Sequence, residues 1–258
     1  MFFKLINLFP SIVIVLERAL MSVSILLITK AKTKTNIEMV SKEFIPENGS
    51  SKRVKNKNLR LLDGKPLIGY VIEAAKNSTL LTDVYVNSDS DEIGNYGKSL
   101  GAKYYKRSKK LASDTATSDE YNYDFFQAFE PDLLVQVNPV CPFITGEDID
   151  KIIQYFIDKK LDSLVTVREE RLQAFCDSKP VNFEIDKKLP RTQDISPVLI
   201  CAWPVCIWKR KTFMSSYEDK GHAIFSGKLD LYPVSFFTAF KISYEEDFEL
   251  AEKLMQII

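Results

Sequence analysis

Apolar side chains recur every three to four residues in five stretches of the chain, the spacing that predicts amphipathic helices. The predicted helices cover residues 66–76, 90–100, 118–129, 145–156 and 243–254. Two of them open on a capping-box pattern, in which a hydroxyl residue is followed three positions later by an acid. These pairs are Thr145 with Asp148 and Ser243 with Glu246.

Short apolar runs separate these helices and predict strands. They cover residues 83–86, 102–106, 133–137, 163–167, 199–208 and 234–242. Strands that alternate with helices form βαβ units. We therefore expect one α/β domain with a mostly parallel, Rossmann-like sheet.

Two segments fall outside this alternation. Residues 169–197 are polar and turn-rich, which predicts an inserted loop or hairpin. In residues 1–40, Glu17 and Arg18 interrupt the apolar runs, whereas a membrane-spanning helix needs about 20 mainly apolar residues. We expect residues 1–40 to be an extension outside the fold and residues 41–258 to form the domain. A peripheral membrane anchor and a first strand or helix are the alternatives, and membrane contact is expected only if the extension belongs to the native protein.

Charge and composition narrow the class of protein. The 258 residues include 35 Lys and Arg and 35 Asp and Glu. Bulk positive charge therefore cannot hold nucleic acid, although a local basic groove is compatible with this balance, and we expect no nucleic-acid partner. The single histidine, His222, excludes a His-rich metal site.

The cysteines indicate the compartment. Cys141, Cys176, Cys201 and Cys206 lack the short paired spacing of a zinc site. They are also too few for a disulfide scaffold. We interpret them as free thiols in a reducing compartment, which predicts a cytoplasmic location.

One loop carries the residue types that phosphate binding requires. Residues 45–58 read Ile-Pro-Glu-Asn-Gly-Ser-Ser-Lys-Arg-Val-Lys-Asn-Lys-Asn. Small residues let backbone N–H groups approach an anion closely, and lysines add positive charge. The spacing of a Walker A loop is absent, and a solvated basic turn would have the same composition.

Several motifs follow one another along residues 44–256 in the order of a known family. Residues 46–58 are similar to P-A-R-G-G-S-K-x-I-P-x-K-N, and residues 59–67 to N-x-R-x-L-x-G-K-P-L. Further matches are residues 87–93 with S-T-D-x-x-E-I, 111–118 with L-A-S-D-T-A-S-S, 139–142 with P-T-S-P, 191–197 with R-x-Q-D-x-P, and 242–252 with I-D-T-E-E-D-x-E-L-A-E. The chain thus resembles the cytidylyltransferases that activate acidic sugars, the CMP-sialic acid and CMP-Kdo synthetase group.

This resemblance implies a fold, a reaction and an assembly. The fold is a three-layer α/β/α nucleotidyltransferase fold with an inserted dimerisation hairpin or loop. The enzyme would join CTP to a 2-keto sugar acid (sialic, another nonulosonic acid, or Kdo-like) and release pyrophosphate, in the synthesis of surface polysaccharide or glycan. Mg²⁺ would be its cofactor, and residues 169–197 would reach the partner in a homodimer.

The resemblance also assigns roles to individual positions. Lys52 and Lys57 would be catalytic, because they offset the charge of the triphosphate. The nucleotide would contact Gly49, Ser50, Ser51, Lys52, Lys57, Asn58, Arg107 and Ser118. The sugar acid would contact Asn138, Arg191, Gln193, Asp194 and Lys241.

The chain departs from the family at positions that handle charge. Asn48 replaces an arginine, and Lys241 and Ser243 replace an acidic pair that holds Mg²⁺ in the family. A lysine cannot ligate Mg²⁺, which requires oxygen ligands. The sequence therefore leaves two alternatives for the metal site. In one, the positive charge of Lys241 takes the place of one metal ion. In the other, a different acid binds the ion. Such acids are Asp89, Asp230, Glu245 and Asp247. The alternative function is a catalytically impaired sugar-nucleotide-binding homologue that acts as partner or regulator.

Overall fold

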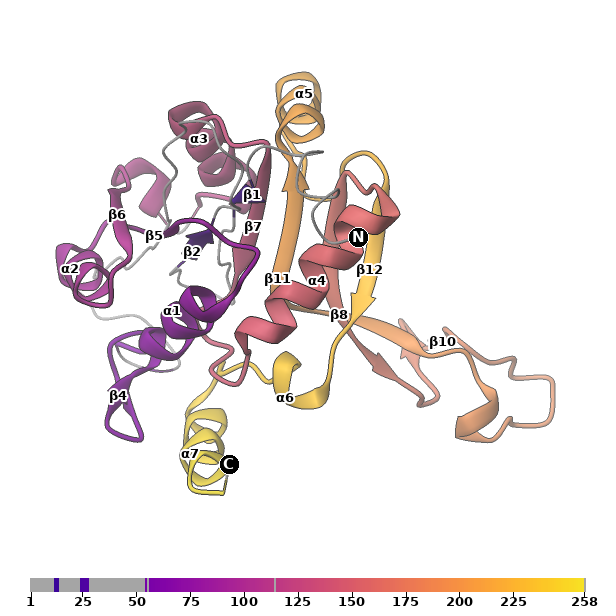
Figure 1. Ribbon diagram of the computed structural model, residues 1–258. Coiled ribbons are helices and arrows are strands. Elements are labelled where there is room, and N and C mark those ends of the chain that lie inside the picture. Colours follow the sequence, from indigo (N-terminus) through magenta and orange to yellow (C-terminus); the bar gives the residue numbers. More distant parts are fainter. Residues whose placement is uncertain (1–11, 14–23, 28–53, 55, 114, 258) are drawn as a thin grey trace.

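The computed structural model describes residues 12–13, 24–27, 54, 56–113 and 115–257 (Figure 1). They form an eight-stranded sheet with the order β12-β8-β11-β7-β2-β5-β6, and β1 also pairs with β7. These strands are β1 (Ile12–Val13), β2 (Ser24–Leu27), β5 (Val84–Ser88), β6 (Lys103–Lys106), β7 (Leu133–Val137), β8 (Ser163–Glu170), β11 (Val198–Lys209) and β12 (Leu229–Pro233).

Strand directions confirm a mostly parallel sheet. The pairs β5–β6, β8–β12 and β1–β7 are parallel. Among the described strands of this sheet, only β11 and β2 run antiparallel to their neighbours, so the other six strands point the same way. The carboxyl ends of β5, β6, β7 and β8 consequently meet at one edge of the sheet.

Helices cover both faces of the sheet (Figure 1). They are α1 (Leu67–Asn77), α2 (Asp91–Ser99), α3 (Ser118–Phe129), α4 (Gly146–Lys159), α5 (Arg210–Lys220), α6 (Phe236–Ala239) and α7 (Glu245–Met255). On one face α1 packs against α4. On the other, Trp208 of β11 contacts Phe213 of α5, which contacts Phe126 of α3. All three of these side chains are fully buried, and the predicted three-layer α/β/α fold is confirmed.

Short elements complete the chain. Two small hairpins pair β3 (Leu61–Leu62) with β4 (Lys65–Pro66), and β9 (Phe175–Cys176) with β10 (Lys179–Pro180). Two 3₁₀ turns are η2 (Lys110–Ala112) and η3 (Thr192–Asp194). The β9–β10 hairpin and η3 belong to the predicted excursion at residues 169–197, which projects away from the sheet as an arm (Figure 1).

The C-terminal part differs from the sequence prediction in three places. The strand predicted over residues 234–242 is wrong: β12 precedes it, and Ser235 accepts the Thr238 N–H at 3.1 Å and caps the short helix α6. The final helix begins at Glu245, and the acid that caps it is Asp247, not Glu246. The sequence pattern did not predict helix α5. Phe213 is its only buried side chain, so the helix lacks the broad apolar face that hydrophobic spacing detects.

The N-terminal extension reaches the sheet in two places. Residues 1–40 were expected to lie outside the fold, yet β1 and β2 come from this segment and pair with β7 and with β5 and β7. The expected boundary at residue 40 does not describe these two strands. The rest of residues 1–40 lies outside the described residues.

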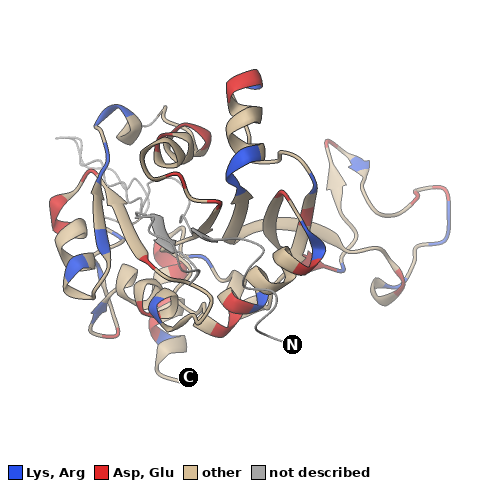
Figure 2. Cartoon of the chain, turned by 45° about the horizontal axis from the view of Figure 1, so that its top comes forward, with Lys and Arg blue, Asp and Glu red and all other residues tan. Residues whose placement is uncertain are grey.

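Charged side chains of both signs are distributed over the described part of the chain. In the view of Figure 2, blue and red stretches are scattered over helices and loops, and neither colour dominates one side. Within these residues no helix is both long and apolar enough to cross a membrane.

Candidate functional site

Buried polar residues gather where the parallel strands end. Asn87 lies near the end of β5, Arg107 directly follows β6 and Asn138 directly follows β7. Each is at most 1% exposed. Buried polar groups are costly unless they have a partner, so this edge of the sheet is a candidate binding site.

Arg107 is held rigidly in this site. Its Nε donates to Asn87 Oδ1 at 2.9 Å, and a terminal nitrogen donates to the Asn87 carbonyl at 3.4 Å. The guanidinium lies 4.4 Å from the ring centroid of Tyr121. Such a fixed, buried cation is suited to an anionic or carbonyl oxygen.

Three buried amide side chains, those of Asn87, Asn122 and Gln136, were missed by the sequence prediction. Asn122 of α3 donates to Gln136 Oε1 of β7 at 3.2 Å. Asn122 Oδ1, Gln136 Nε2 and Asn87 Nδ2 are buried and have no hydrogen-bond partner. A glutamine within the otherwise apolar run of residues 133–137 was the signal that could have revealed them.

Lys57 meets two segments that are distant in sequence. Its Nζ donates to the Ile242 carbonyl at 2.8 Å, across 185 positions of the chain. The Ile242 N–H donates to the Val140 carbonyl at 2.9 Å. Three of the motifs found in the sequence, at residues 46–58, 139–142 and 242–252, are therefore joined at one point.

Asn58 and Asn138 each keep a polar atom without a partner. Asn58 is 3% exposed, and its Oδ1 has no hydrogen bond. Asn138 Oδ1 accepts the Val140 N–H at 3.3 Å, but its Nδ2 has none. An unpaired buried donor or acceptor costs about 1–3 kcal/mol, so these atoms are suited to meet a ligand.

The pKa of the Cys141 thiol is influenced by the positive charges of two lysines. Burial raises its pKa to about 12, against the opposing charges of Lys241 and Lys57. Both ammonium groups thus act on one buried sulfur, and the thiol stays protonated near neutral pH. All four cysteines are free, as predicted, and Cys176 and Cys201 are exposed.

The other predicted site residues lie on α3, on the arm or outside the described residues. Ser118 is in the first turn of α3, behind the Thr117–Glu120 capping box. Arg191, Gln193 and Asp194 are exposed on the arm, where Arg191 pairs with Asp194 at 2.7 Å. Gly49, Ser50, Ser51 and Lys52 lie outside the described residues.

The described side chains do not fit a resident divalent ion. No group of three or more His, Cys, Asp or Glu among them could hold a metal. Asp247 accepts the N–H groups of Ser243 and Tyr244, both at 2.8 Å, and Glu245 pairs with Arg60. Mg²⁺ requires oxygen ligands in octahedral geometry, and Lys241 supplies none.

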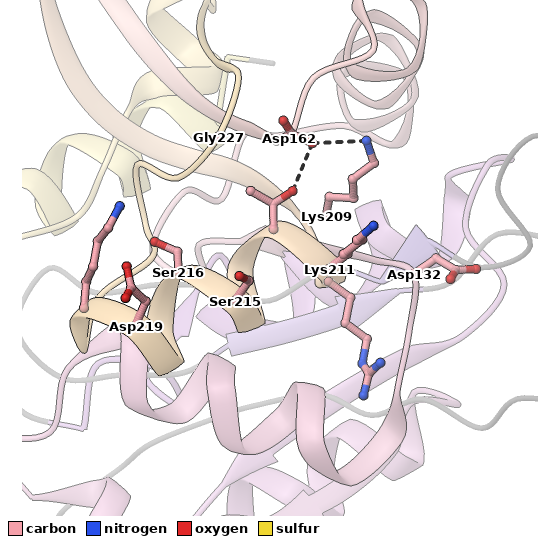
Figure 3. Close-up of a pocket in the computed structure, with 11 residues that line it drawn as sticks. Asp132, Asp162, Lys209, Lys211, Ser215, Ser216, Asp219 and Gly227 are labelled. Atoms are coloured by element: carbon pink, nitrogen blue, oxygen red, sulfur yellow. Dashed lines mark hydrogen bonds and ion pairs between the residues drawn. The ribbon is translucent and has the colours of Figure 1, made fainter.

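A hollow lies at the edge of the sheet opposite the candidate site, beside the start of α5 (Figure 3). Its volume is about 920 Å³, and no predicted site residue lines it. Asp162, which precedes β8, accepts from Lys209 and Thr212, both at 3.1 Å. Its carboxylate therefore has structural partners.

Comparison with known proteins places these features in a family. A model described as cytidylyltransferase matches residues 44–196. The chain is 27% identical to post-translational flagellin modification protein B of Campylobacter coli over 81% of its length and 92% of that protein. It is 26% identical to CMP-N,N'-diacetyllegionaminic acid synthase of Campylobacter jejuni, with the same coverage of both chains.

A solved structure supports the fold. A CMP:2-keto-3-deoxy-manno-octonic acid synthetase in complex with CTP superimposes with a TM-score of 0.62. It covers 87% of this chain and 99% of its own, at 14% identity. The similarity therefore extends through the sheet, both helical layers and most of the chain.

Proposed function

Because the chain belongs to the cytidylyltransferase family, we propose that it joins the α-phosphate of CTP to the anomeric hydroxyl of a 2-keto sugar acid of the nonulosonic class. The Pα–O bond to the sugar forms while the Pα–O bond to the β-phosphate breaks. Pyrophosphate leaves, and the hydroxyl proton is released. The similarity to a CMP-legionaminic acid synthase supports this class of sugar.

One observation supports the reaction most directly: the junction of Lys57, Val140 and Ile242. It places the lysine that ends the basic loop beside the carboxyl end of β7. Phosphoryl-type transfer depends on positioning and on charge neutralisation. Lysine ammonium groups can neutralise charge here, and buried amide groups that lack a hydrogen-bond partner can position a ligand.

The individual roles follow the same proposal. Gly49, Ser50, Ser51 and Lys52 would surround the triphosphate through backbone N–H groups and an ammonium. Arg107, Asn58 and Ser118 would contact the nucleoside, and Asn138 the sugar. Mg²⁺ would arrive with the triphosphate, whose oxygens bind it.

The arm would complete the site in a homodimer. Five of its apolar side chains are at least 55% exposed: Leu172, Phe175, Val181, Ile185 and Leu189. An exposed apolar surface of this kind favours a protein partner. Arg191, Gln193 and Asp194 would then meet the sugar acid at the partner's site, since a guanidinium matches a carboxylate.

Light scattering tests the dimer. We expect a dimeric mass for the native chain and a monomeric mass after joint replacement of Leu172, Ile185 and Leu189 by Ser. Leu250→Ser, at an exposed apolar position on α7, is the matched control and should stay dimeric. A native chain that is monomeric at all concentrations would refute the assembly.

Pyrophosphate release tests the reaction. CTP, UTP, ATP and GTP are each paired with Kdo, sialic, legionaminic and pseudaminic acids in the presence of Mg²⁺. We expect turnover with CTP and a nonulosonic acid, and its loss in Lys52→Ala and Lys57→Ala but not in Lys253→Ala, at an exposed position. CTP binding without turnover for any acid would instead indicate the catalytically impaired homologue.

A further inference from the structure

The backbone around Ile242 is fixed from both sides. Its N–H is bound to the Val140 carbonyl and its carbonyl to Lys57 Nζ, and its side chain is fully buried. The apolar cluster that encloses it includes Val54, Leu67 and Phe248. The neighbours of Ile242 therefore have defined positions, unlike residues of an ordinary surface loop.

The acids of this segment already have protein partners. Asp247 caps α7 by accepting two backbone N–H groups. Glu245 pairs with Arg60, whose guanidinium also lies 3.8 Å above the Phe248 ring. Recruiting either acid to a metal would uncap the helix or break this pair.

Lys241 of this segment and Lys57 of the loop at residues 45–58 lie near the same buried thiol. Lys241 is half-buried and Lys57 is 4% exposed, and the charge of each is felt by the buried Cys141 sulfur. Two cations held close together repel each other. A polyanion that contacts both ammonium groups would offset this repulsion, and Lys57 belongs to the motif for which the sequence predicts phosphate binding.

We propose that Lys241, seated by the Lys57–Ile242–Val140 hydrogen bonds, supplies a fixed positive charge to the phosphates of CTP in place of a divalent ion held by the protein. This proposal rests on the proposed CTP-dependent reaction. A point-charge ammonium neutralises phosphate without imposing coordination geometry. Divalent ions then reach the site only on the nucleotide.

Direct binding measurements test this without relying on turnover. Mn²⁺ alone is titrated into the nucleotide-free, full-length protein and followed by electron paramagnetic resonance. We expect no stoichiometric site in the native chain. We expect one site to appear in the double variant Lys241→Asp, Ser243→Asp, because two carboxylates flanking the fixed Ile242 supply the oxygen ligands that a divalent ion prefers.

CTP binding, measured by calorimetry in EDTA, forms the second arm. Lys241→Met should weaken it about tenfold or more, the loss of one charge-assisted hydrogen bond. Lys241→Arg should restore much of the affinity, and Lys253→Met, the matched control on exposed α7, should leave it unchanged. Thermal unfolding of each variant separates lost affinity from lost fold.

Each outcome bears on one proposal or the other. Stoichiometric Mn²⁺ binding by the native chain, or unchanged CTP affinity in Lys241→Met, would overturn the role of Lys241 while leaving the reaction intact. A raised KM for the sugar acid with unchanged CTP affinity would reassign Lys241 to the sugar carboxylate, and overturn it too. A native chain that neither binds nor consumes CTP would refute the proposed function itself.

Discussion

Asn87 is expected to control both the stability of the fold and the affinity of the proposed nucleotide site. Its Oδ1 accepts Arg107 Nε at 2.9 Å. Asn87 is 0% exposed and Arg107 1% exposed, so water cannot replace the lost acceptor. Asn87→Ala therefore leaves a buried cation short of one hydrogen bond.

The expected cost follows from the charge of the donor. A hydrogen bond to a charged group contributes about 1.5–3 kcal/mol. Asn87 Nδ2 has no partner in the native fold, so deleting it recovers part of that loss. We expect Asn87→Ala to lower the free energy of unfolding by about 1–2 kcal/mol, a factor of roughly 5–30 in the folding equilibrium constant.

Urea unfolding at pH 7 measures this difference, with CTP affinity as a second readout. Asn87→Asp should be more stable than Asn87→Ala, because a carboxylate retains the acceptor and adds an opposite charge. Asn95→Ala, at an exposed position of α2, should change stability little. An Ala variant within about 0.3 kcal/mol of the native chain, or an Asp variant less stable than Ala, would refute this account of Arg107.

Three further predictions concern other parts of the fold. Gly146→Ala should lower the free energy of unfolding in urea by about 1–3 kcal/mol, because its Cβ would lie 2.7 Å from the backbone at the end of α1. In the control Gly64→Ala no atom lies within 4 Å of the added Cβ, so that variant should lose only the strain of its φ of +77°. Equal losses in the two variants would contradict this prediction. Burial by itself would raise the pKa of Asp162, but hydrogen bonds to its carboxylate outweigh burial and hold the pKa below the ordinary value. Its contribution to stability is therefore fully present above about pH 4 and is lost as pH falls through the folded pKa. Asp162→Asn should make the free energy of unfolding less dependent on pH in the acid range, and an unchanged dependence would count against this account. Iodoacetamide at pH 8 should modify the exposed Cys176 first and should modify the buried Cys141 only when the chain unfolds. Mass spectrometry of the labelled protein measures the order, and early labelling of Cys141 would contradict its burial.

Hydrophobic spacing predicted the central elements well because their packing is simple. Helix α3 and strand β7 have the predicted bounds, and α4 opens on the Thr145–Asp148 capping box. Most of the buried side chains in each of these elements are apolar. Local pattern and tertiary burial agree there, so the pattern alone was sufficient.

Prediction failed where local pattern and burial diverge. Residues 234–242 are rich in Val, Phe and Ile, which favour strands, yet Ser235 and Thr238 close a turn of helix within them. In α5 a mostly polar helix is anchored by the single buried Phe213. Neither case can be read from spacing, because the outcome depends on neighbours that are distant in sequence.

Lys57 shows why site residues are harder to predict than site motifs. The motif predicts a lysine near phosphate, and the structure shows a bond from that lysine to Ile242, which no local pattern contains. An ammonium has three donors, so a bond to one carbonyl does not by itself prevent a bond to a phosphate. The same lysine can therefore seat the segment that carries Lys241 and contact the nucleotide. The motifs at residues 46–58 and 242–252 consequently form one structural unit, and the charge change at Lys241 has to be judged against Lys57 rather than by itself.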